Sequence, residues 1–294
     1  MTLIGALEAG GTKFICAVGT AHDNILARET IKTTDPATTL ASCLDFFRRC
    51  ELDFGEIGKL GIASFGPLDL IPKSPGFGSL LNTPKKDWAG TNFIEFFQKN
   101  LNVAVVLDTD VNAAVLAEIR WGSVKACHSA AYVTIGTGIG VGIYANGGLL
   151  HGAMHPELGH VAVPRAKSDG DFTSVCPFHG DCVEGLASGP AVKARWGMGA
   201  ENLGANHPGW DIEAYYIAQL CRTITLSVSP AHIVLGGGVM AHQPLLGAVN
   251  AKLSQLLNHY LPISQLAGSS GPYIVRESFG GMSGLIGAFA LVSR

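Results

Sequence analysis

Two glycines, a threonine and a lysine follow one another near the start of the chain. The segment Gly10-Gly11-Thr12-Lys13 lies between the apolar runs Leu3–Leu7 and Phe14–Val18, which predicts two strands joined by a tight turn. Backbone N–H groups of a glycine turn, a hydroxyl and an ammonium are donors that suit the phosphates of a nucleotide. Taken alone, the segment is better interpreted as an ordinary hairpin turn.

The same strand, turn and strand pattern occurs again about 125 residues later. Gly136-Thr137-Gly138-Ile139-Gly140 joins the apolar runs Ala130–Ile135 and Val141–Tyr144. A glycine string between two strands argues against a dinucleotide-binding fingerprint, and the sequence contains no Gly-x-x-x-x-Gly-Lys-Ser/Thr phosphate loop. The repetition instead predicts an internal duplication. A third glycine run, Gly236-Gly237-Gly238, follows the apolar run His232–Leu235, and such a loop can lie under an adenosine or serve simply as a turn.

Asp110 follows a predicted buried strand, Val103–Leu107, opens a predicted helix and precedes Val111-Asn112. Aspartate is a preferred helix N-cap, which is the structural interpretation. An aspartate at a strand end can also be the general base that takes a hydroxyl proton during phosphoryl transfer. Asp108 is an alternative candidate, and the residues alone leave the choice open.

Two cysteines and two histidines form a metal-ligand pattern in the middle of the chain. The residues are His160, Cys176, His179 and Cys182, with His155 as an alternative fourth ligand. Four nitrogen and sulfur donors without an open position are typical of a structural tetrahedral zinc site. Incidental cysteines in a polar loop are the competing interpretation.

The surrounding elements alternate between strands and helices. Apolar periodicity predicts further strands at 60–65 and 232–235 and helices at 38–50, 93–99, 110–118, 212–228 and 246–256. This alternation in both halves predicts an α/β protein of two similar lobes with a cleft between them. The first lobe is expected to span residues 1–117 and the second, with the cysteine-rich loop, residues 118–282. A glycine-broken helix at about 283–294 is expected to pack back across the lobe junction.

Composition limits the class of partner. The 294 residues carry a formal net charge of −3 with a pI near 6.3, so no basic field favours nucleic acid. No run of 18 apolar residues and no signal peptide pattern occurs, so we expect a cytoplasmic protein that acts on small molecules and not on membranes. The seven cysteines have no disulfide rhythm, which favours free thiols or metal ligands.

The three glycine loops, in this order, resemble the phosphate 1, phosphate 2 and adenosine motifs of the actin, hexokinase and Hsp70 ATPase superfamily. Thr109-Asp110-Val111-Asn112, Glu157-Leu158-Gly159-His160 and Cys176-Pro177-Phe178-His179-Gly180-Asp181-Cys182 are similar to motifs of ROK-family sugar kinases, in the fructokinase branch. The resemblance covers essentially the whole chain. It implies a two-lobed actin-like (ribonuclease H-like) ATPase fold with a zinc-binding loop.

The resemblance also implies roles for individual residues. Asp110 becomes the general base, and His160, Cys176, His179 and Cys182 become the zinc ligands. The implied sugar-binding residues are Glu157, His160, Glu184, Asn112 and the Gly66-Pro67 turn, for which a plain strand-ending turn is an equally good interpretation. The implied nucleotide-binding residues are Gly10, Gly11, Thr12, Lys13, Gly136, Thr137, Gly138, Ser188, Gly189, Gly236, Gly237 and Gly238.

The implied reaction is transfer of a phosphoryl group from Mg²⁺-bound ATP to a hexose hydroxyl, fructose 6-OH first, with mannose and glucose as alternatives. Relatives are commonly homodimers. Three positions depart from the wider family pattern, namely Glu8 for Asp, Thr109 for Asn and His179 for Cys. A sugar-responsive ROK regulator is the rival interpretation; it needs a helix-turn-helix domain ahead of the first glycine turn, where seven residues precede Glu8. An acetate or butyrate kinase would leave the cysteine-rich loop unexplained.

Overall fold

The chain folds into two compact units. The computed structural model describes residues 2–261 and 272–293. Unit 1 comprises Met1–Arg120, Leu149–Pro156 and Met282–Arg294, and unit 2 comprises Trp121–Gly148 and Glu157–Gly281. Among the described residues, no helix combines the length and apolar character that crossing a membrane requires.

Unit 1 is built on a five-stranded sheet with the order β3-β2-β1-β4-β5. β1 pairs antiparallel with β2 and parallel with β4, while β2 pairs antiparallel with β3 and β4 parallel with β5. The hairpin expected around the first glycine turn is therefore confirmed. The strands are β1 Leu3–Ala9, β2 Lys13–Ala21, β3 Asn24–Lys32, β4 Ile57–Ser64 and β5 Ala104–Thr109.

Unit 2 repeats this topology in a second five-stranded sheet, β10-β9-β6-β7-β8. β6 pairs antiparallel with β7 and parallel with β9, and β9 pairs parallel with β10. β6 and β7 thus correspond to β1 and β2, and β9 and β10 to β4 and β5, which confirms the predicted internal duplication. The strands are β6 Ala130–Ile135, β7 Ile139–Ala145, β8 Gly148–Leu149, β9 His232–Gly236 and β10 Ile274–Arg276.

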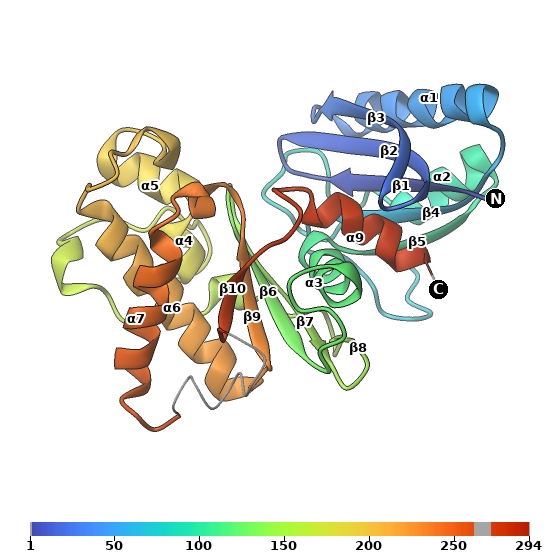
Figure 1. Ribbon diagram of the computed structural model, residues 1–294. Helices are drawn as coiled ribbons and strands as arrows, with labels where there is room; N and C mark the ends of the chain where they lie inside the picture. The colour runs from blue at the N-terminus through green and yellow to red at the C-terminus, as the bar shows by residue number, and fades with distance from the viewer. Residues whose placement is uncertain (1, 262–271, 294) are drawn as a thin grey trace. The chain divides into compact units, whose positions relative to one another are not determined.

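Strand alternation sends large and small side chains of β1 to opposite faces of the unit 1 sheet. Leu3 and Leu7 belong to a core that includes the buried phenylalanines of α1 Pro36–Phe54 and α2 Phe93–Leu101. Ala6 belongs to a second cluster, made largely of alanines, on the face covered by α9 Ser283–Val292 (Figure 1). One face is therefore filled by aromatic side chains, and the other admits a helix at close range.

Two glycines allow the close packing of α9. A Cβ on Gly61 of β4 would lie 1.9 Å from the Ala288 carbonyl oxygen, and one on Gly287 would lie 2.3 Å from backbone atoms of Ala113. α9 packs against β1, β4 and β5 and belongs to unit 1. The expected helix is therefore present. Its glycines do not interrupt it; they let its backbone approach neighbouring backbone closely.

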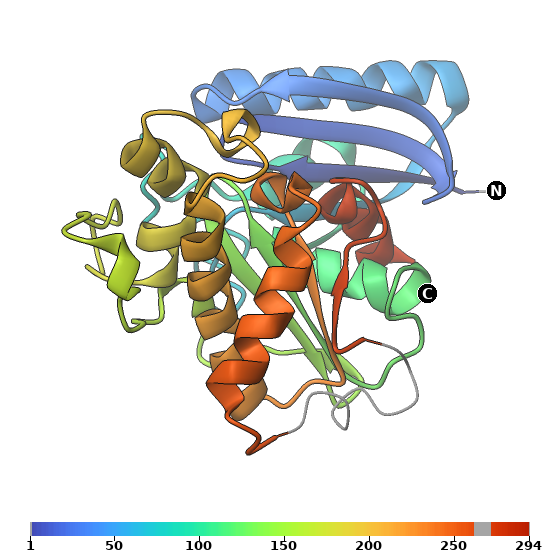
Figure 2. The same ribbon diagram turned by 60° about the vertical axis from the view of Figure 1, so that its left-hand side comes forward.

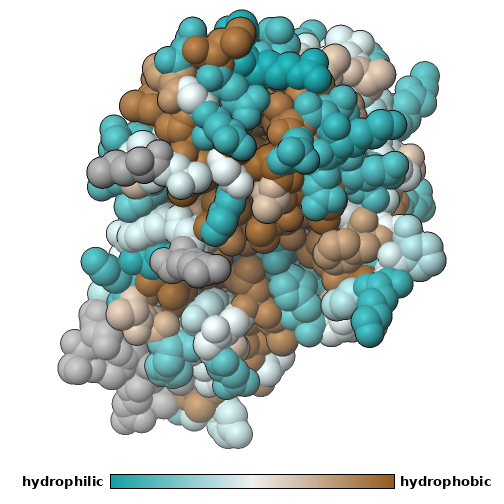
Figure 3. Space-filling model, turned by 90° about the vertical axis from the view of Figure 1, so that its right-hand side faces the viewer, coloured by the Kyte–Doolittle hydropathy of each residue, from teal (hydrophilic) through white to brown (hydrophobic). Residues whose placement is uncertain are grey.

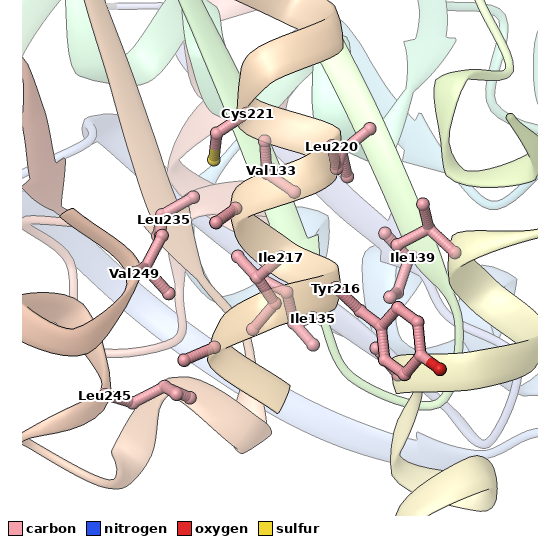
Figure 4. Close-up of a cluster of buried hydrophobic side chains, with 14 of the residues drawn as sticks. Val133, Ile135, Ile139, Tyr216, Ile217, Leu220, Cys221, Leu235, Leu245 and Val249 are labelled. Atoms are coloured by element: carbon pink, nitrogen blue, oxygen red, sulfur yellow. The ribbon is translucent and has the colours of Figure 1, made fainter. Parts of the chain in front are cut away.

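The core of unit 2 gathers aliphatic side chains from the sheet and from two long helices. Val133, Ile135 and Ile139 of the sheet face Ile217 and Leu220, all labelled in Figure 4. The helices are α6 Gly209–Ser227 and α7 Leu245–Leu257, which run side by side (Figure 2). The alternating apolar residues of β6 thus turn toward the helical layer.

The remaining helices connect the sheets. They are α3 Asp110–Trp121, α4 Val183–Ala187 and α5 Gly189–Trp196, with the short 3₁₀ helices η1 Leu158–His160, η2 Lys167–Asp169, η3 Ala200–Asn202 and η4 Gly238–Ala241. The sequence patterns did not predict β3, β8, β10, α4 or α5. Polar and apolar residues are both present on the face drawn in Figure 3. Exposed hydrophobic residues such as Leu52 are common on folded proteins.

Candidate active site and metal centre

The end of β5 leads directly into α3, and the three residues at this junction have separate tasks. Thr109 Oγ1 accepts a hydrogen bond from the Asn112 N–H at 3.1 Å, so Thr109 caps the helix. Asp110 is the first helical residue, and its Oδ1 accepts from the Val111 N–H at 2.9 Å. The structural role considered for Asp110, the N-cap, is therefore performed by the residue before it.

Burial changes the acidity of Asp110. The side chain is partly buried, and desolvation raises its pKa from 3.8 to about 6, against the opposing effect of the Val111 N–H. A carboxylate with a pKa near neutrality remains ionised at pH 7 and binds a proton more strongly than an ordinary aspartate. That combination suits a general base.

Asp108, the competing candidate, is fully engaged. It is 5% exposed. Its Oδ1 accepts from the Thr109 N–H at 2.7 Å and from Asn112 Nδ2 at 2.8 Å. Its Oδ2 lies 2.9 Å from His151 Nε2. A carboxylate with both oxygens committed to partners stabilises the strand end, which favours Asp110 as the base. Asn112, predicted to contact sugar, is itself buried and held by Asp108.

The first glycine turn is closed by its own backbone. The Gly10 N–H donates to the Lys13 carbonyl at 3.0 Å, and a Cβ on Gly10 would lie 2.7 Å from that oxygen. Thr33 Oγ1 donates to the Gly10 carbonyl at 2.8 Å. Glycine is required here by close backbone approach, which is the property that a phosphate-binding turn needs.

Sequence reasoning missed a second lysine at this turn. Lys85 Cε lies 3.0 Å, and its Nζ 3.8 Å, from the place where a Cβ on Gly11 would be. The ammonium of Lys85 therefore lies at the first glycine turn. Because Lys85 is remote in sequence and belongs to no phosphate-binding motif, only the fold reveals its position.

Unit 2 brings together three of the four segments that were predicted to bind the nucleotide. The Gly136 N–H donates to the Gly138 carbonyl at 2.9 Å, and the Gly189 N–H donates to the Gly136 carbonyl at 2.7 Å. Ser188 caps α5 by accepting from the Ala191 N–H. Gly237, at φ +91°, would place a Cβ 2.4 Å from the Ile135 carbonyl. The three segments thus converge at the end of β6.

His160, Cys176, His179 and Cys182 form a compact set of donors. Their ligand atoms all lie within 4.8 Å of one another. Cys176 Sγ is 3.9 Å from His160 Nδ1 and 3.7 Å from His179 Nδ1, and Cys182 Sγ is 3.7 Å from His160 Nδ1. His155, the alternative ligand, is not in this set.

The donor set fits zinc. Zinc binds sulfur at about 2.3 Å and imidazole nitrogen at about 2.0–2.1 Å, so neighbouring donors in a tetrahedron lie about 3.3 to 3.8 Å apart. The distances of 3.7 to 3.9 Å between these atoms come close to that range. Two sulfurs and two nitrogens leave no open position, which is typical of a structural site.

Of the two glutamates predicted to bind the sugar, Glu184 lies beside the metal cluster. Glu184 Oε2 accepts from the Ile139 N–H at 2.9 Å, and its Oε1 lies 3.9 Å from His160 Nε2. Glu184 therefore lies between the glycine turn of β6 and β7 and a histidine of the metal cluster. Glu157 is exposed, three residues before His160. Gly159 lies between them so close to β7 that a Cβ would be 1.7 Å from the Ile139 carbonyl.

The Gly66-Pro67 turn follows β4 through a cis peptide bond. The next residue, Leu68, donates its N–H to His155 Nε2 at 3.0 Å, and the His155 ring packs against Gly66. The structure thus gives His155 a partner outside the metal cluster. No motif in the sequence pointed to this contact.

Comparison with known proteins identifies the family of the chain. The family model described as the ROK family matches residues 4–294. The chain belongs to the ROK family. Two of its curated relatives are fructokinases. One, from Streptococcus mutans, is 42% identical over 264 residues, covering 89% of this chain and 88% of the relative. The other, from Zymomonas mobilis, is 39% identical over 292 residues, covering 98% and 96%.

A solved ROK structure shows the same fold. A ROK-family glucokinase from Streptomyces griseus, in complex with glucose and AMPPNP, has a TM-score of 0.75 and 22% identity, with 98% of each chain covered. The expected fold, an α/β protein of actin-like ROK type, is therefore confirmed. The His and Cys cluster supports the zinc-binding loop that the ROK resemblance implied.

Proposed function

We propose that this ROK protein is an ATP-dependent fructokinase, which transfers the γ-phosphoryl group of ATP to the 6-hydroxyl of fructose. The observation that carries the proposal is Asp110, a partly buried carboxylate at a strand end whose pKa is raised to about 6. The fructokinases of S. mutans and Z. mobilis support fructose as the acceptor, because they share 42% and 39% of aligned residues with this chain.

In the proposed reaction, Asp110 accepts the proton of the attacking hydroxyl. Oriented attack matters most in phosphoryl transfer, because the loose transition state leaves the protein little covalent work. Thr109 and Asp108 hold the strand end, so the carboxylate keeps its direction. Glu157 is proposed to accept hydrogen bonds from other sugar hydroxyls, since a carboxylate can accept two.

The glycine turns are proposed to hold the nucleotide. In unit 1, Gly10-Gly11-Thr12-Lys13 and Lys85 supply N–H groups, a hydroxyl and two ammonium groups for phosphate oxygens. In unit 2, Gly136-Thr137-Gly138, Ser188-Gly189 and Gly236-Gly237-Gly238 supply the remaining contacts. Mg²⁺ bound with ATP neutralises charge on the β- and γ-phosphate oxygens.

A coupled assay of ADP formation with Mg²⁺-ATP and separate hexoses tests the proposal. We expect the highest kcat/KM with fructose and lower values with mannose and glucose. A preference for mannose or glucose would change the proposed acceptor sugar and leave the proposed kinase activity intact. Sugar-independent or absent ADP formation by the folded protein would refute kinase activity and favour a sugar-binding regulator.

The metal cluster is proposed to hold one structural Zn²⁺. With His160 Nδ1 on the metal side, its Nε2 faces Glu184, and a carboxylate beside a ligating imidazole fixes its orientation. Elemental analysis of the purified protein checks this proposal. We expect about one zinc per chain, and its loss in Cys176→Ser.

A further inference from the structure

The segment Leu149–Pro156 carries two histidines that the proposed reaction does not use. It begins at the last residue of β8 and belongs to unit 1 by its contacts, although the chain on both sides of it belongs to unit 2. His151 and His155 lie four residues apart in it, and the next residue after Pro156 is Glu157, the proposed sugar-reading carboxylate. Within unit 1, each histidine bonds to a different part of the proposed acceptor site.

His151 bonds to the end of β5. Its Nε2 lies 2.9 Å from Asp108 Oδ2 and 3.4 Å from Asn112 Nδ2. Asp108 in turn accepts from the N–H of Thr109, the residue just before Asp110. The carboxylate raises the pKa of His151, since it stabilises the protonated ring. His151 therefore completes the hydrogen bonding of the group that fixes the base.

His155 bonds to the turn after β4. It is 6% exposed, and its Nε2 accepts from the Leu68 N–H at 3.0 Å. A Cβ added to Gly66 would lie 3.3 Å from His155 Cε1, so the ring also packs on the turn itself. Accepting at Nε2 requires the neutral ring with its proton on Nδ1. Burial lowers the pKa of His155, which favours that form.

We propose that Leu149–Pro156 is a two-point strap, in which His151 and His155 are positioning residues for the acceptor hydroxyl. His151 holds the strand end that carries Asp110, and His155 holds the Gly66-Pro67 turn. The strap thereby fixes the position of the end of β5 relative to the Gly66-Pro67 turn, and the chain continues directly to Glu157. This inference rests on the proposed sugar kinase function. Neither histidine touches the reacting atoms in the proposal.

Kinetics of strap variants separate positioning from general damage. In His155→Leu the Leu68 N–H loses its acceptor while the buried volume stays similar, and in His151→Phe the Asp108 oxygen loses its partner. An unpaired buried polar group costs enough to disorder its surroundings, so we expect kcat/KM for the hexose to fall about tenfold or more. We expect KM for ATP to change less than about twofold. His155→Gln, whose amide oxygen can accept, should recover part of the loss.

Two controls accompany these variants. Met154→Gln changes an exposed residue of the same segment, 41% exposed, and should match the wild type. In the double variant His151→Phe/His155→Leu, the fold loss of hexose kcat/KM should be smaller than the product of the two single fold losses. Either single substitution already frees part of the same segment, so the two effects are coupled. Thermal unfolding of each variant shows whether the protein remains folded.

A readout independent of activity tests the contact itself. Hydrogen exchange at the Leu68 amide should accelerate in His155→Leu and return toward the wild-type rate in His155→Gln. Wild-type protein without kinase activity would refute the proposed function and, with it, the role of the strap in acceptor positioning, whatever the exchange shows. Active, folded strap variants with unchanged hexose kcat/KM would overturn the strap alone, as would equal losses for hexose and ATP.

Discussion

Two aspartates at the end of β5 have the same chemistry and different surroundings. Asp108 is saturated by the Thr109 N–H, Asn112 and His151, so both of its oxygens are committed. Asp110 accepts from the adjacent Val111 N–H and is otherwise controlled by desolvation. Hydrogen bonds to the ionised form lower the pKa of a carboxyl group, and burial raises it. The two residues therefore suit structure and proton transfer respectively.

Replacing the base should reduce turnover strongly. In Asp110→Asn the amide cannot take the hydroxyl proton, and a positioned general base contributes about 10² to 10⁴ in rate. We expect kcat to fall by that order while KM for ATP changes little. In the wild type, kcat/KM should fall about tenfold per pH unit below about pH 6, because Asp110, with its pKa of about 6, becomes protonated. A variant with wild-type kcat, or a profile flat to pH 5, would contradict the assignment.

The same variant should stabilise the protein at neutral pH. The pKa of Asp110 is raised in the folded state from 3.8 to about 6, so the folded protein binds this proton more tightly than the unfolded chain. The contribution of Asp110 to stability is therefore fully present below about pH 4 and lost as pH rises through about 6. Asp110→Asn should exceed the wild type in free energy of unfolding by up to about 3 kcal/mol near pH 8. Urea unfolding near pH 4 should show a smaller difference.

Sequence reasoning reached these residues unevenly. The glycine turns and the His and Cys spacing were predictable, because their partners are close in sequence and their chemistry follows from residue type. The choice between Asp110 and Asp108 needed the family resemblance, since it depends on His151 and burial. Lys85 could not be found at all, because its contact with the first glycine turn exists only in the folded chain.

At the scale of elements, a buried charge cluster joins Asp169, the last residue of η2, to the helices α4, α5 and α6. The Arg195 guanidinium of α5 donates to both Asp169 oxygens, at 2.6 and 3.2 Å, and to the Leu186 carbonyl of α4 at 2.8 Å. It also lies 3.4 Å from Glu213 of α6. The Arg195 side chain is 5% exposed and both carboxylates are fully buried. Desolvation raises the pKa of Glu213 well above its usual range.

Removing the arginine should destabilise unit 2. Arg195→Met leaves two buried carboxylates without their cation, and breaking a buried ion pair costs about 3 to 5 kcal/mol. Lys193→Met changes an exposed cation of the same helix and should alter stability by less than about 0.5 kcal/mol. Chemical denaturation measures both. Equal stability of Arg195→Met and the wild type would show that protonated carboxylates replace the pairing at little cost.

Helix α9 depends on small residues at its contact with the sheet. In Gly61→Ala the new Cβ would lie 1.9 Å from the Ala288 carbonyl, so α9 must shift. We expect a loss of about 1 to 3 kcal/mol, as for other overpacked sites. Gly247→Ala on α7 meets no atom within 4 Å and should gain up to about 1 kcal/mol from helix propensity. A free energy of unfolding unchanged in Gly61→Ala would mean that α9 can move away from the sheet without loss of stability.

Element prediction failed where tertiary contacts outweigh the local pattern. The long buried strands and helices were predictable from apolar periodicity. β3 Asn24–Lys32 carries charged residues along a half-exposed edge, so its sequence lacks the apolar run expected of a strand. α4 and α5 are short and contain glycines, and they are held by the Arg195 cluster and by caps at Cys182 and Ser188. Periodicity cannot detect a helix of one or two turns.

At the scale of the molecule, duplication gives each unit its own sheet and its own hydrophobic core. The cores of unit 1 and unit 2 are separate clusters. The duplication itself was predictable because each copy retains a strand, glycine turn and strand, whereas the edge strands β3, β8 and β10 were not. The metal-ligand cluster has no counterpart among the described residues of unit 1. Metal loss should therefore affect the two units unequally.

Zinc removal tests that asymmetry. A structural zinc contributes directly to folding free energy, because the unfolded chain lacks a formed site. The cluster joins His160 of η1 to the loop that ends at Cys182, the cap of α4, so chelation should increase amide exchange first in η1, α4 and α5. Exchange in β1 and β2 of unit 1 should stay near the holo rate. Cys176→Ser should reproduce this pattern, and Cys127→Ser, outside the cluster, should not. Uniform loss of protection in both units would contradict separate stabilisation, because it would show that the metal supports one cooperative molecule.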